Sequence, residues 1–109
     1  MNAGDRIARF EGDLRRFFRE MSEFVDRGKC AYDDDLAVRR AVERTAENIG
    51  EAIKRLRALD ADRFADAAWQ HAARFRDFIA HHYEEIDHDI VWRIATVRMP
   101  ALEAMLDDS

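Results

Sequence analysis

Apolar residues recur every three or four positions along most of the chain, which is the spacing of one face of an α-helix, and no stretch alternates as a strand does. Only one proline and four glycines interrupt this pattern. Gly28 follows the first apolar stripe, and glycine commonly ends a helix. We therefore predict an all-α fold that opens with a long amphipathic helix over residues 5–27. The stripe of this helix consists of Ile7, Phe10, Leu14, Phe17, Met21 and Phe24.

A second stripe predicts a helix that ends near Leu59. The three aspartates at 33–35 precede it and can supply its N-cap. Gly50 lies beside the stripe, where a neighbouring backbone can approach closely. The opposite face carries arginine and glutamate one turn apart, for which simple solvation is the default interpretation. The apolar positions of this helix are Val38, Val42, Thr45, Ile49, Ala52, Ile53 and Leu56.

Two further stripes predict the rest of the fold. We expect the third helix to be capped by Asp60 or Asp62 and to end near Tyr83. Its stripe consists of Phe64, Ala68, His71, Phe75, Phe78, Ile79 and His82. We expect the last helix to be capped by Asp87 or Asp89 and to kink at Pro100. Its stripe consists of Ile90, Val91, Ile94, Val97, Leu102, Met105 and Leu106.

These elements predict an up-and-down bundle of four to five helices with short connections. A chain of 109 residues encloses one core, so we expect a single domain over residues 1–109. No apolar run approaches the roughly 20 residues of a membrane span, and the opening residues are too polar for a secretory leader. A single cysteine, Cys30, cannot form an internal disulfide. We therefore expect a cytoplasmic protein.

The formal net charge is −5, so any contact with nucleic acid must depend on local basic patches. The second helix is such a region, because its bases exceed its acids by three. Arginine suits phosphate better than lysine does, since its planar fork can donate two hydrogen bonds. The alternative for these arginines is surface ion pairing. The candidate RNA contacts are Arg39, Arg40 and Arg44, with Arg74 in the third helix.

Residues 74–87, RFRDFIAHHYEEID, concentrate arginine, histidine, tyrosine and acids in one stretch. A di-iron bundle needs a Glu-x-x-His pair on each of two helices, and the chain has only one such pair, Glu85 with His88, so we expect no metal site. A second interpretation is a solvated helix face whose acids cap the next helix. A third is cleavage of RNA without metal, with arginine holding the phosphate oxygens and histidine moving protons.

Arg76 and His81 carry this third interpretation, but they do not share one face of a helix. Residues five apart differ by about 140° of rotation and about 7.5 Å of rise. Two copies of the helix that meet across a two-fold axis would bring arginine and histidine from both chains into one cleft. The chemistry would then require a homodimer.

The spacing Arg76, four residues, His81, one residue, Tyr83 resembles the Arg-x4-His-x-Tyr motif of the HepT-type toxins, which are minimal HEPN-domain ribonucleases of prokaryotic toxin–antitoxin pairs. The segment AVERTAENIGEAIKRL is similar to the second helix of that family, and Trp69 precedes Arg76 by seven residues as the family's tryptophan does. HHYEEIDHDIVWRI and MPALEAML extend the resemblance from about Asp5 to Leu106. The family frequently has asparagine directly after the motif arginine, where this chain has Asp77.

The resemblance implies a homodimer that cuts RNA without metal in a composite cleft and needs no cofactor of its own. Arg76 would bind the phosphate, His81 would act as general base or acid, and Asp77 would support one of them. The family's partner is a small nucleotidyltransferase antitoxin, in a type VII-like pair, which transfers AMP from ATP onto the tyrosine, here Tyr83. The added bulk and negative charge would block an anionic substrate. The alternative function is a non-catalytic helical subunit that binds a nucleotidyltransferase.

Overall fold

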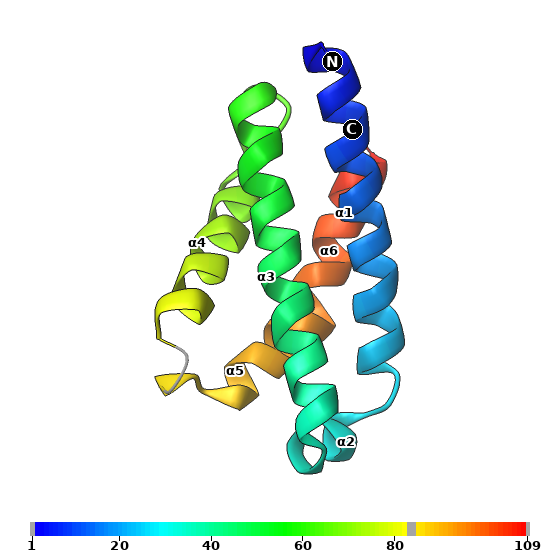
Figure 1. Cartoon of the computed structure of the whole chain (residues 1–109), viewed down its shortest axis with the longest axis vertical. Coiled ribbons are helices and arrows are strands. Elements are labelled where there is room, and N and C mark those ends of the chain that lie inside the picture. The colour runs from blue at the N-terminus through cyan, green and yellow to red at the C-terminus, as the bar shows by residue number, and fades with distance from the viewer. Residues whose placement is uncertain (1, 83–84, 109) are drawn as a thin grey trace.

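The computed structural model describes residues 2–82 and 85–108, and all regular structure within them is helical (Figure 1). This confirms the all-α prediction. The elements are α1 (Ala3–Val25), α2 (Lys29–Asp34), α3 (Leu36–Leu59), α4 (Ala67–His81), α5 (His88–Arg93), the π-helix η2 (Ile94–Arg98) and α6 (Met99–Asp107). None of these helices is long and apolar enough to cross a lipid bilayer, within the part of the chain that is described.

The long helix α3 is the centre of the bundle. It packs against α1 on one side and against α4 on the other (Figure 1). The segment formed by α5, η2 and α6 passes behind α3 and returns to contact α1. All the apolar positions predicted for α3 are buried, from Val38 to Leu56. Asp35 caps this helix, because its carboxylate accepts a hydrogen bond of 2.9 Å from the backbone N–H of Ala37.

The segment before α3 contains a short helix that the apolar pattern did not predict. Asp33 and Asp34 belong to this helix, α2, and only Asp35 of the three aspartates serves α3 as a cap. Gly28, with φ of +91°, lies between α1 and α2 and ends the first helix as predicted. A turn as short as α2 shows no helical periodicity in the sequence. It nevertheless buries Tyr32 completely.

The predicted start of the third long helix was wrong. Neither Asp60 nor Asp62 caps it; Asp66 does, with its carboxylate 2.9 Å from the backbone nitrogen of Ala68. Residues 60–65 form a turn that turns Phe64 inward, where its ring meets Trp69 edge-on at 5.1 Å. Burial of Phe64 in this turn, at 1% exposure, favours a later start of α4.

The buried face predicted for α4 was right only in part. His71 and His82 are exposed, and Phe78 is 44% exposed. Ile79 is buried as predicted, and Ala68 and Phe75 pack partly buried against the core. The other buried residues of α4 are Trp69, Ala72 and Ala73, which the predicted stripe did not include. Apolar residues surround most of this helix, so the sequence does not single out one face. The small alanines let α4 approach α3 closely, and this approach selects the face that is buried.

The C-terminal segment begins as predicted, because Asp87 accepts hydrogen bonds from the backbone N–H groups of Asp89 and Ile90. The predicted irregularity at Pro100 is a π-helix over Ile94–Arg98 that comes just before it. Proline lacks an N–H and crowds the carbonyl four residues earlier, and the wider turn relieves both problems. The prediction that Ile90 and Val97 are buried was wrong, since they are 54% and 59% exposed. Val97 lies within the π-helix, whose wider turn changes the direction of its side chain, whereas Ile90 precedes the π-helix in α5.

Candidate functional site

Arg76 lies where α4 crosses α3 most closely. A Cβ atom at Gly50 would be only 2.2 Å from the Cβ of Arg76 and 3.0 Å from the carbonyl oxygen of Ala72. Glycine at this position is therefore required for the contact, as its place beside the α3 stripe predicted. The side chain of Arg76 crosses α3 over Gly50 and remains 29% exposed. The aliphatic part of the Arg76 side chain is thus fixed by packing against Gly50, while part of the side chain remains exposed to solvent.

Two carboxylates hold the Arg76 guanidinium. Its Nε is 3.5 Å from Oε2 of Glu51, and its Nη1 donates a hydrogen bond of 3.2 Å to Oδ1 of Asp77. The Nε–H is buried and makes no hydrogen bond of good geometry among the described residues. An arginine whose aliphatic chain is fixed by packing, and whose N–H groups are not all hydrogen-bonded, is suited to bind an added anion.

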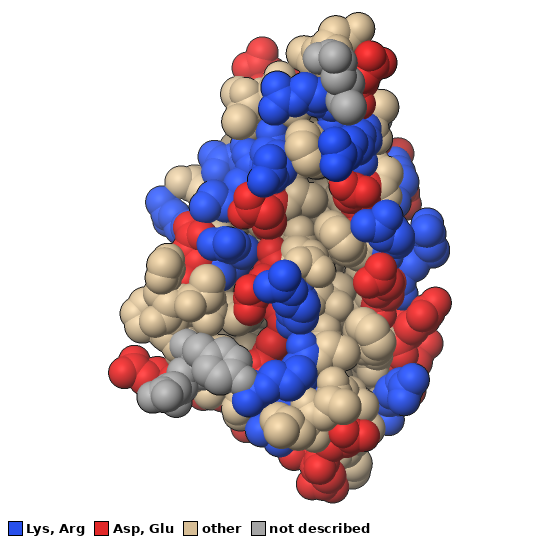
Figure 2. Space-filling model, in the orientation of Figure 1, with Lys and Arg blue, Asp and Glu red and all other residues tan. Residues whose placement is uncertain are grey.

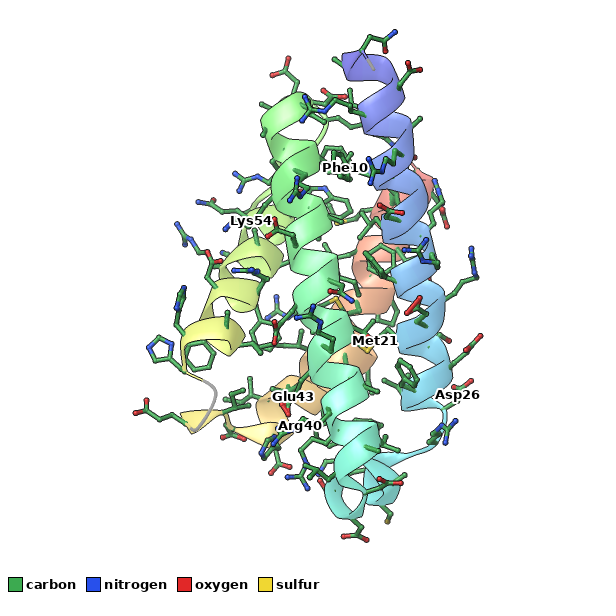
Figure 3. The ribbon with its side chains drawn as sticks, viewed as in Figure 1. Phe10, Met21, Asp26, Arg40, Glu43 and Lys54 are labelled. Carbon is green, nitrogen blue, oxygen red and sulfur yellow. The ribbon has the colours of Figure 1, made fainter. Side chains whose placement is uncertain are left out.

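Asp77 is itself paired across the helix interface. Nζ of Lys54, which extends from α3 toward α4 (Figure 3), donates to both carboxylate oxygens at 3.0 and 3.4 Å. The hydrogen bond from Lys54, and after it the one from Arg76, lowers the pKa of Asp77. Asp77 is therefore ionised near neutral pH and compensates part of the positive charge around Arg76.

His81 is the last residue of α4 and is exposed. Arg76 faces α3, whereas His81 is displaced by about 140° around the helix axis, as spacing of five residues requires. One chain therefore does not bring the two groups together on one face. Next to His81, the His82 ring stacks on Phe78 with ring centroids 4.8 Å apart. Tyr83, the residue predicted to accept AMP, lies outside the described residues.

The arginines predicted to contact RNA have different surroundings. Arg39 donates to the backbone carbonyls of Tyr32 and Asp33, at 3.3 and 2.6 Å, so its guanidinium joins α3 to α2. Arg40 is 3.3 Å from Glu43. Arg44 pairs with Glu47 at 3.6 Å, yet its side chain is 75% exposed. Arg74 is exposed on α4.

Glu43 is a polar residue of the interior that the sequence interpretation did not single out. Its side chain is 3% exposed, and its Oε2 has no hydrogen-bond partner within the described part of the chain. Figure 3 shows Glu43 beside Arg40 on the lower half of α3. Burial, and after it the Glu43 carboxylate, raises the pKa of the buried Tyr32 hydroxyl. The spacing could have indicated that Glu43 is buried, because Glu43 precedes Gly50 by seven residues and so lies on the same side of α3.

An apolar groove of about 750 Å³ separates α4 from the C-terminal segment. Phe75, Phe78, Ile90 and Met105 are among the residues that line it, and Arg74 and Arg98 add positive charge. His81 follows Phe78 by one helical turn but does not line the groove. Among residues 2–82 and 85–108, no three histidine, cysteine, aspartate or glutamate side chains are close enough to hold a metal ion together.

A family model described as "Ribonuclease HepT-like" matches residues 14–108, which is most of the chain. The chain belongs to the HepT-like family. The archaeal protein named "Putative RNase MJ0127", from Methanocaldococcus jannaschii, is 36% identical over 96 residues, covering 81% of this chain and 79% of its own length. The bacterial protein "Putative RNase TTE0752", from Caldanaerobacter subterraneus subsp. tengcongensis, is 27% identical over 99 residues, covering 87% and 88%. No solved structure matches the chain.

Two of the sequence features that carry the HepT-like resemblance lie in the structural surroundings of Arg76. The Ile-Gly-Glu-Ala block supplies the glycine on which Arg76 packs and, in Glu51, a carboxylate that holds it. Trp69, seven residues before Arg76, is buried and anchors the start of the same helix against Phe64. Each block therefore positions the HepT-like arginine, although the contacts between them depend on how two helices cross.

Proposed function

We propose that this chain is the ribonuclease toxin of a type VII-like toxin–antitoxin pair and cuts RNA without a metal ion. The observation that carries the proposal is the setting of Arg76, which is fixed over Gly50 but retains an accessible guanidinium. The relatives named as RNases support the class of reaction. Arg76 binds the non-bridging oxygens of the scissile phosphate, and His81 transfers protons.

The reaction is an internal transesterification. A base removes the proton from the 2′-hydroxyl, and the 2′-oxygen attacks phosphorus. The bond from phosphorus to the 5′-oxygen breaks, and an acid protonates that oxygen. The products are a 2′,3′-cyclic phosphate and a 5′-hydroxyl. Imidazole can serve as base or acid, and the arginine fork stabilises the charge that develops on the phosphate.

The active form in this proposal is a homodimer. Arg76 and His81 of one chain point about 140° apart, so a second copy must supply the missing partner. The groove beside α4 supports this assembly, because Phe78 and Ile90 leave apolar surface exposed close to His81. Burial of that surface between two copies would bring two α4 helices together near the site.

The RNase proposal predicts that the purified chain cleaves RNA in excess EDTA and leaves cyclic phosphate ends. His81→Ala should lower the cleavage rate by about 10²- to 10⁴-fold, the usual contribution of a general acid or base. His71→Ala is the matched control, because His71 is also an exposed histidine of α4. Circular dichroism and thermal unfolding check that both variants fold. A wild-type rate of cleavage in His81→Ala would remove His81 from the mechanism. Because His71 lines the groove proposed to bury the dimer contact, size-exclusion chromatography checks that His71→Ala remains dimeric.

Control by a nucleotidyltransferase antitoxin is the second part of the proposal. The hydroxyl oxygen of Tyr83 attacks the α-phosphorus of ATP, loses its proton and displaces pyrophosphate, and the phosphate of the attached AMP opposes the binding of RNA. Incubation with a nucleotidyltransferase encoded beside this gene and ATP should add the mass of AMP, and Tyr83→Phe should escape the modification. Tyr32, the only other tyrosine, is buried and serves as the internal control. Peptide mapping that places AMP on Tyr32 would contradict the assignment.

A non-catalytic subunit that binds a nucleotidyltransferase is the second candidate. The two acids around Arg76 favour it, because Glu51 and Asp77 reduce the positive charge offered to a phosphate. Expression without the neighbouring gene separates the candidates. The toxin should arrest growth, and Arg76→Ala should abolish the arrest. A binding subunit would leave growth unchanged, and Arg76→Ala would weaken the complex instead.

A further inference from the structure

Phe10 lies at the surface between α1 and α3, with an arginine from each helix near its ring (Figure 3). The guanidinium carbon of Arg9 is 5.8 Å from the ring centroid, and that of Arg55 is 5.4 Å from it. Phe10 packs against the core with one part of its ring and is only partly buried. Two guanidinium groups from different helices therefore lie over a partly exposed aromatic ring.

Carboxylates neutralise the positive charge of Arg9 and Arg55 only in part. Arg9 is exposed and forms no ion pair within the described part of the chain. Arg55 is 54% exposed and has one acidic partner, Glu51. Figure 2 shows that lysine and arginine side chains gather on this upper part of the visible face, over the N-terminal half of α1 and the C-terminal half of α3. This part of the surface is therefore locally basic, although the net charge of the whole protein is negative.

Glu51 connects this surface with the candidate catalytic arginine. One of its carboxylate oxygens is 3.3 Å from Nε of Arg55, and the other is 3.5 Å from Nε of Arg76. The two guanidinium groups are therefore separated by a single carboxylate. A polyanion bound to Arg76 would meet Arg55 next, and after it Phe10 and Arg9.

We propose that Arg9, Phe10 and Arg55 form a subsite, here called the Phe10 subsite, for nucleotides that flank the cleaved linkage in single-stranded RNA. The arginines bind the phosphates, and the aromatic ring stacks on an unpaired base, which a duplex would not expose. The inference rests on the proposed ribonuclease function and extends its substrate contacts. Arg9 and Phe10 precede residues 14–108, which the family model matches.

The test compares Phe10→Leu and Arg9→Gln with a control, Arg19→Gln. Leucine keeps the apolar packing of Phe10 but cannot stack on a base. Arg19 is an exposed arginine of the same helix, and nine residues of rotation place it about 180° from Phe10. Substrates are RNAs that share one located cleavage site and are shortened in steps from either end. Thermal unfolding verifies that each variant folds, and Arg9→Gln changes only surface.

We expect each subsite variant to raise KM about five- to tenfold for the longer RNAs, as the loss of one stacked base or phosphate contact does. The kcat should be unchanged, and the shortest cleavable RNA should show no difference. Fluorescence anisotropy in a His81→Ala background measures binding without cleavage. There Arg9→Gln should reduce the slope of log K against log salt by about 0.7, whereas Phe10→Leu should lower affinity at an unchanged slope.

The outcomes separate the two proposals. If the wild-type chain cleaves RNA and both subsite variants match Arg19→Gln at every length, the Phe10 subsite is refuted while the ribonuclease stands. If the wild-type chain leaves RNA intact, the ribonuclease proposal fails and the subsite fails with it. A loss of kcat at all lengths would also overturn the inference, because it would place Phe10 and Arg9 in support of the fold around Arg76.

Discussion

Gly50 is the residue at which α3 admits the helix that carries Arg76. We predict that Gly50→Ala destabilises the protein by about 1–3 kcal/mol, because its new methyl group would overlap Arg76 and the carbonyl of Ala72. The separation of α4 from α3 should also displace Arg76 from Glu51 and lower the rate of RNA cleavage. Urea unfolding measures the first effect, and an RNA cleavage assay measures the second.

Gly12 provides the matched control for this substitution. It lies within α1, and a Cβ atom there would have nothing within 4 Å. Gly12→Ala should therefore stabilise the protein by about 0.5–1 kcal/mol through helix propensity alone. If Gly50→Ala stabilised the protein as Gly12→Ala does, the close approach of α4 at Gly50 would be disproved.

The catalytic candidates themselves could be read from the spacing of residues, but their partners could not. Arg76 and His81 follow from a motif within one helix, and the 140° between them follows from helix geometry. Glu51 and Lys54 reach Arg76 and Asp77 only because α3 and α4 cross at Gly50. Contacts of this kind depend on the angle and rotation of two helices, which no local pattern specifies.

At the scale of elements, an ion-pair cluster joins α1 to the turn before α4. Arg63 donates to both carboxylate oxygens of Glu11, at 2.9 and 3.2 Å, and Arg15 donates to one of them at 3.3 Å. The Arg63 and Glu11 side chains are 23% and 24% exposed. The hydrogen bond from Arg63 is the largest cause that lowers the pKa of Glu11. The folded state therefore favours the ionised carboxylate.

We predict that Glu11→Gln lowers the free energy of unfolding at pH 7 by about 1 kcal/mol. A lowered pKa in the folded state stabilises the fold above the unfolded value of about 4.5 and loses that effect as the pH falls below it. The difference between Glu11→Gln and wild type should thus shrink as the pH falls below 4.5 and vanish once the pH is below the lowered pKa of the folded state. Urea unfolding between pH 3 and 7 measures it.

Glu20→Gln is the control, because Glu20 is also on α1 but its pair with Arg16 spans 3.6 Å between more exposed side chains. Its stability should match the wild type within a few tenths of a kcal/mol. A pH-independent loss in Glu11→Gln would show that packing, and not the carboxylate charge, explains the effect.

The helices differ in how far the sequence alone predicts their buried faces and their ends. The faces of α1 and α3 could be predicted, because apolar residues concentrate on one stripe, although the buried Phe18 of α1 was left out of that stripe. The face of α4 could not, since alanines and aromatic residues surround that helix. Its start was misplaced because three nearby aspartates can each cap a helix, and burial of Phe64 decides among them. The helix α2 is too short for its period to appear.

At the scale of the whole molecule, the exposed apolar surface lies close to the exposed imidazole. Phe78 and Ile90 border the groove between α4 and the C-terminal segment, and His81 follows Phe78 by one turn. A partner that covers this surface would place its own α4 near His81. The proposed homodimer therefore relates two features that one chain leaves unexplained, the apolar groove and the separation of Arg76 from His81.

The composite site predicts that two inactive variants restore each other. Homodimers of Arg76→Ala and of His81→Ala should both be inactive. If each site takes Arg76 from one subunit and His81 from the other, a mixed dimer keeps one site in which both groups are intact. An isolated mixed dimer should therefore show about half of the wild-type activity, and an unseparated random mixture, in which half of the dimers are mixed, about a quarter.

Subunit exchange under mild denaturant, followed by isolation of mixed dimers through two different affinity tags, provides the material for this measurement. Each variant mixed with a second preparation of itself is the control and should remain inactive. Inactive mixed dimers beside an active wild type would mean that Arg76 and His81 act within one chain, which would require α4 to unwind between them, since an intact helix keeps them about 140° apart.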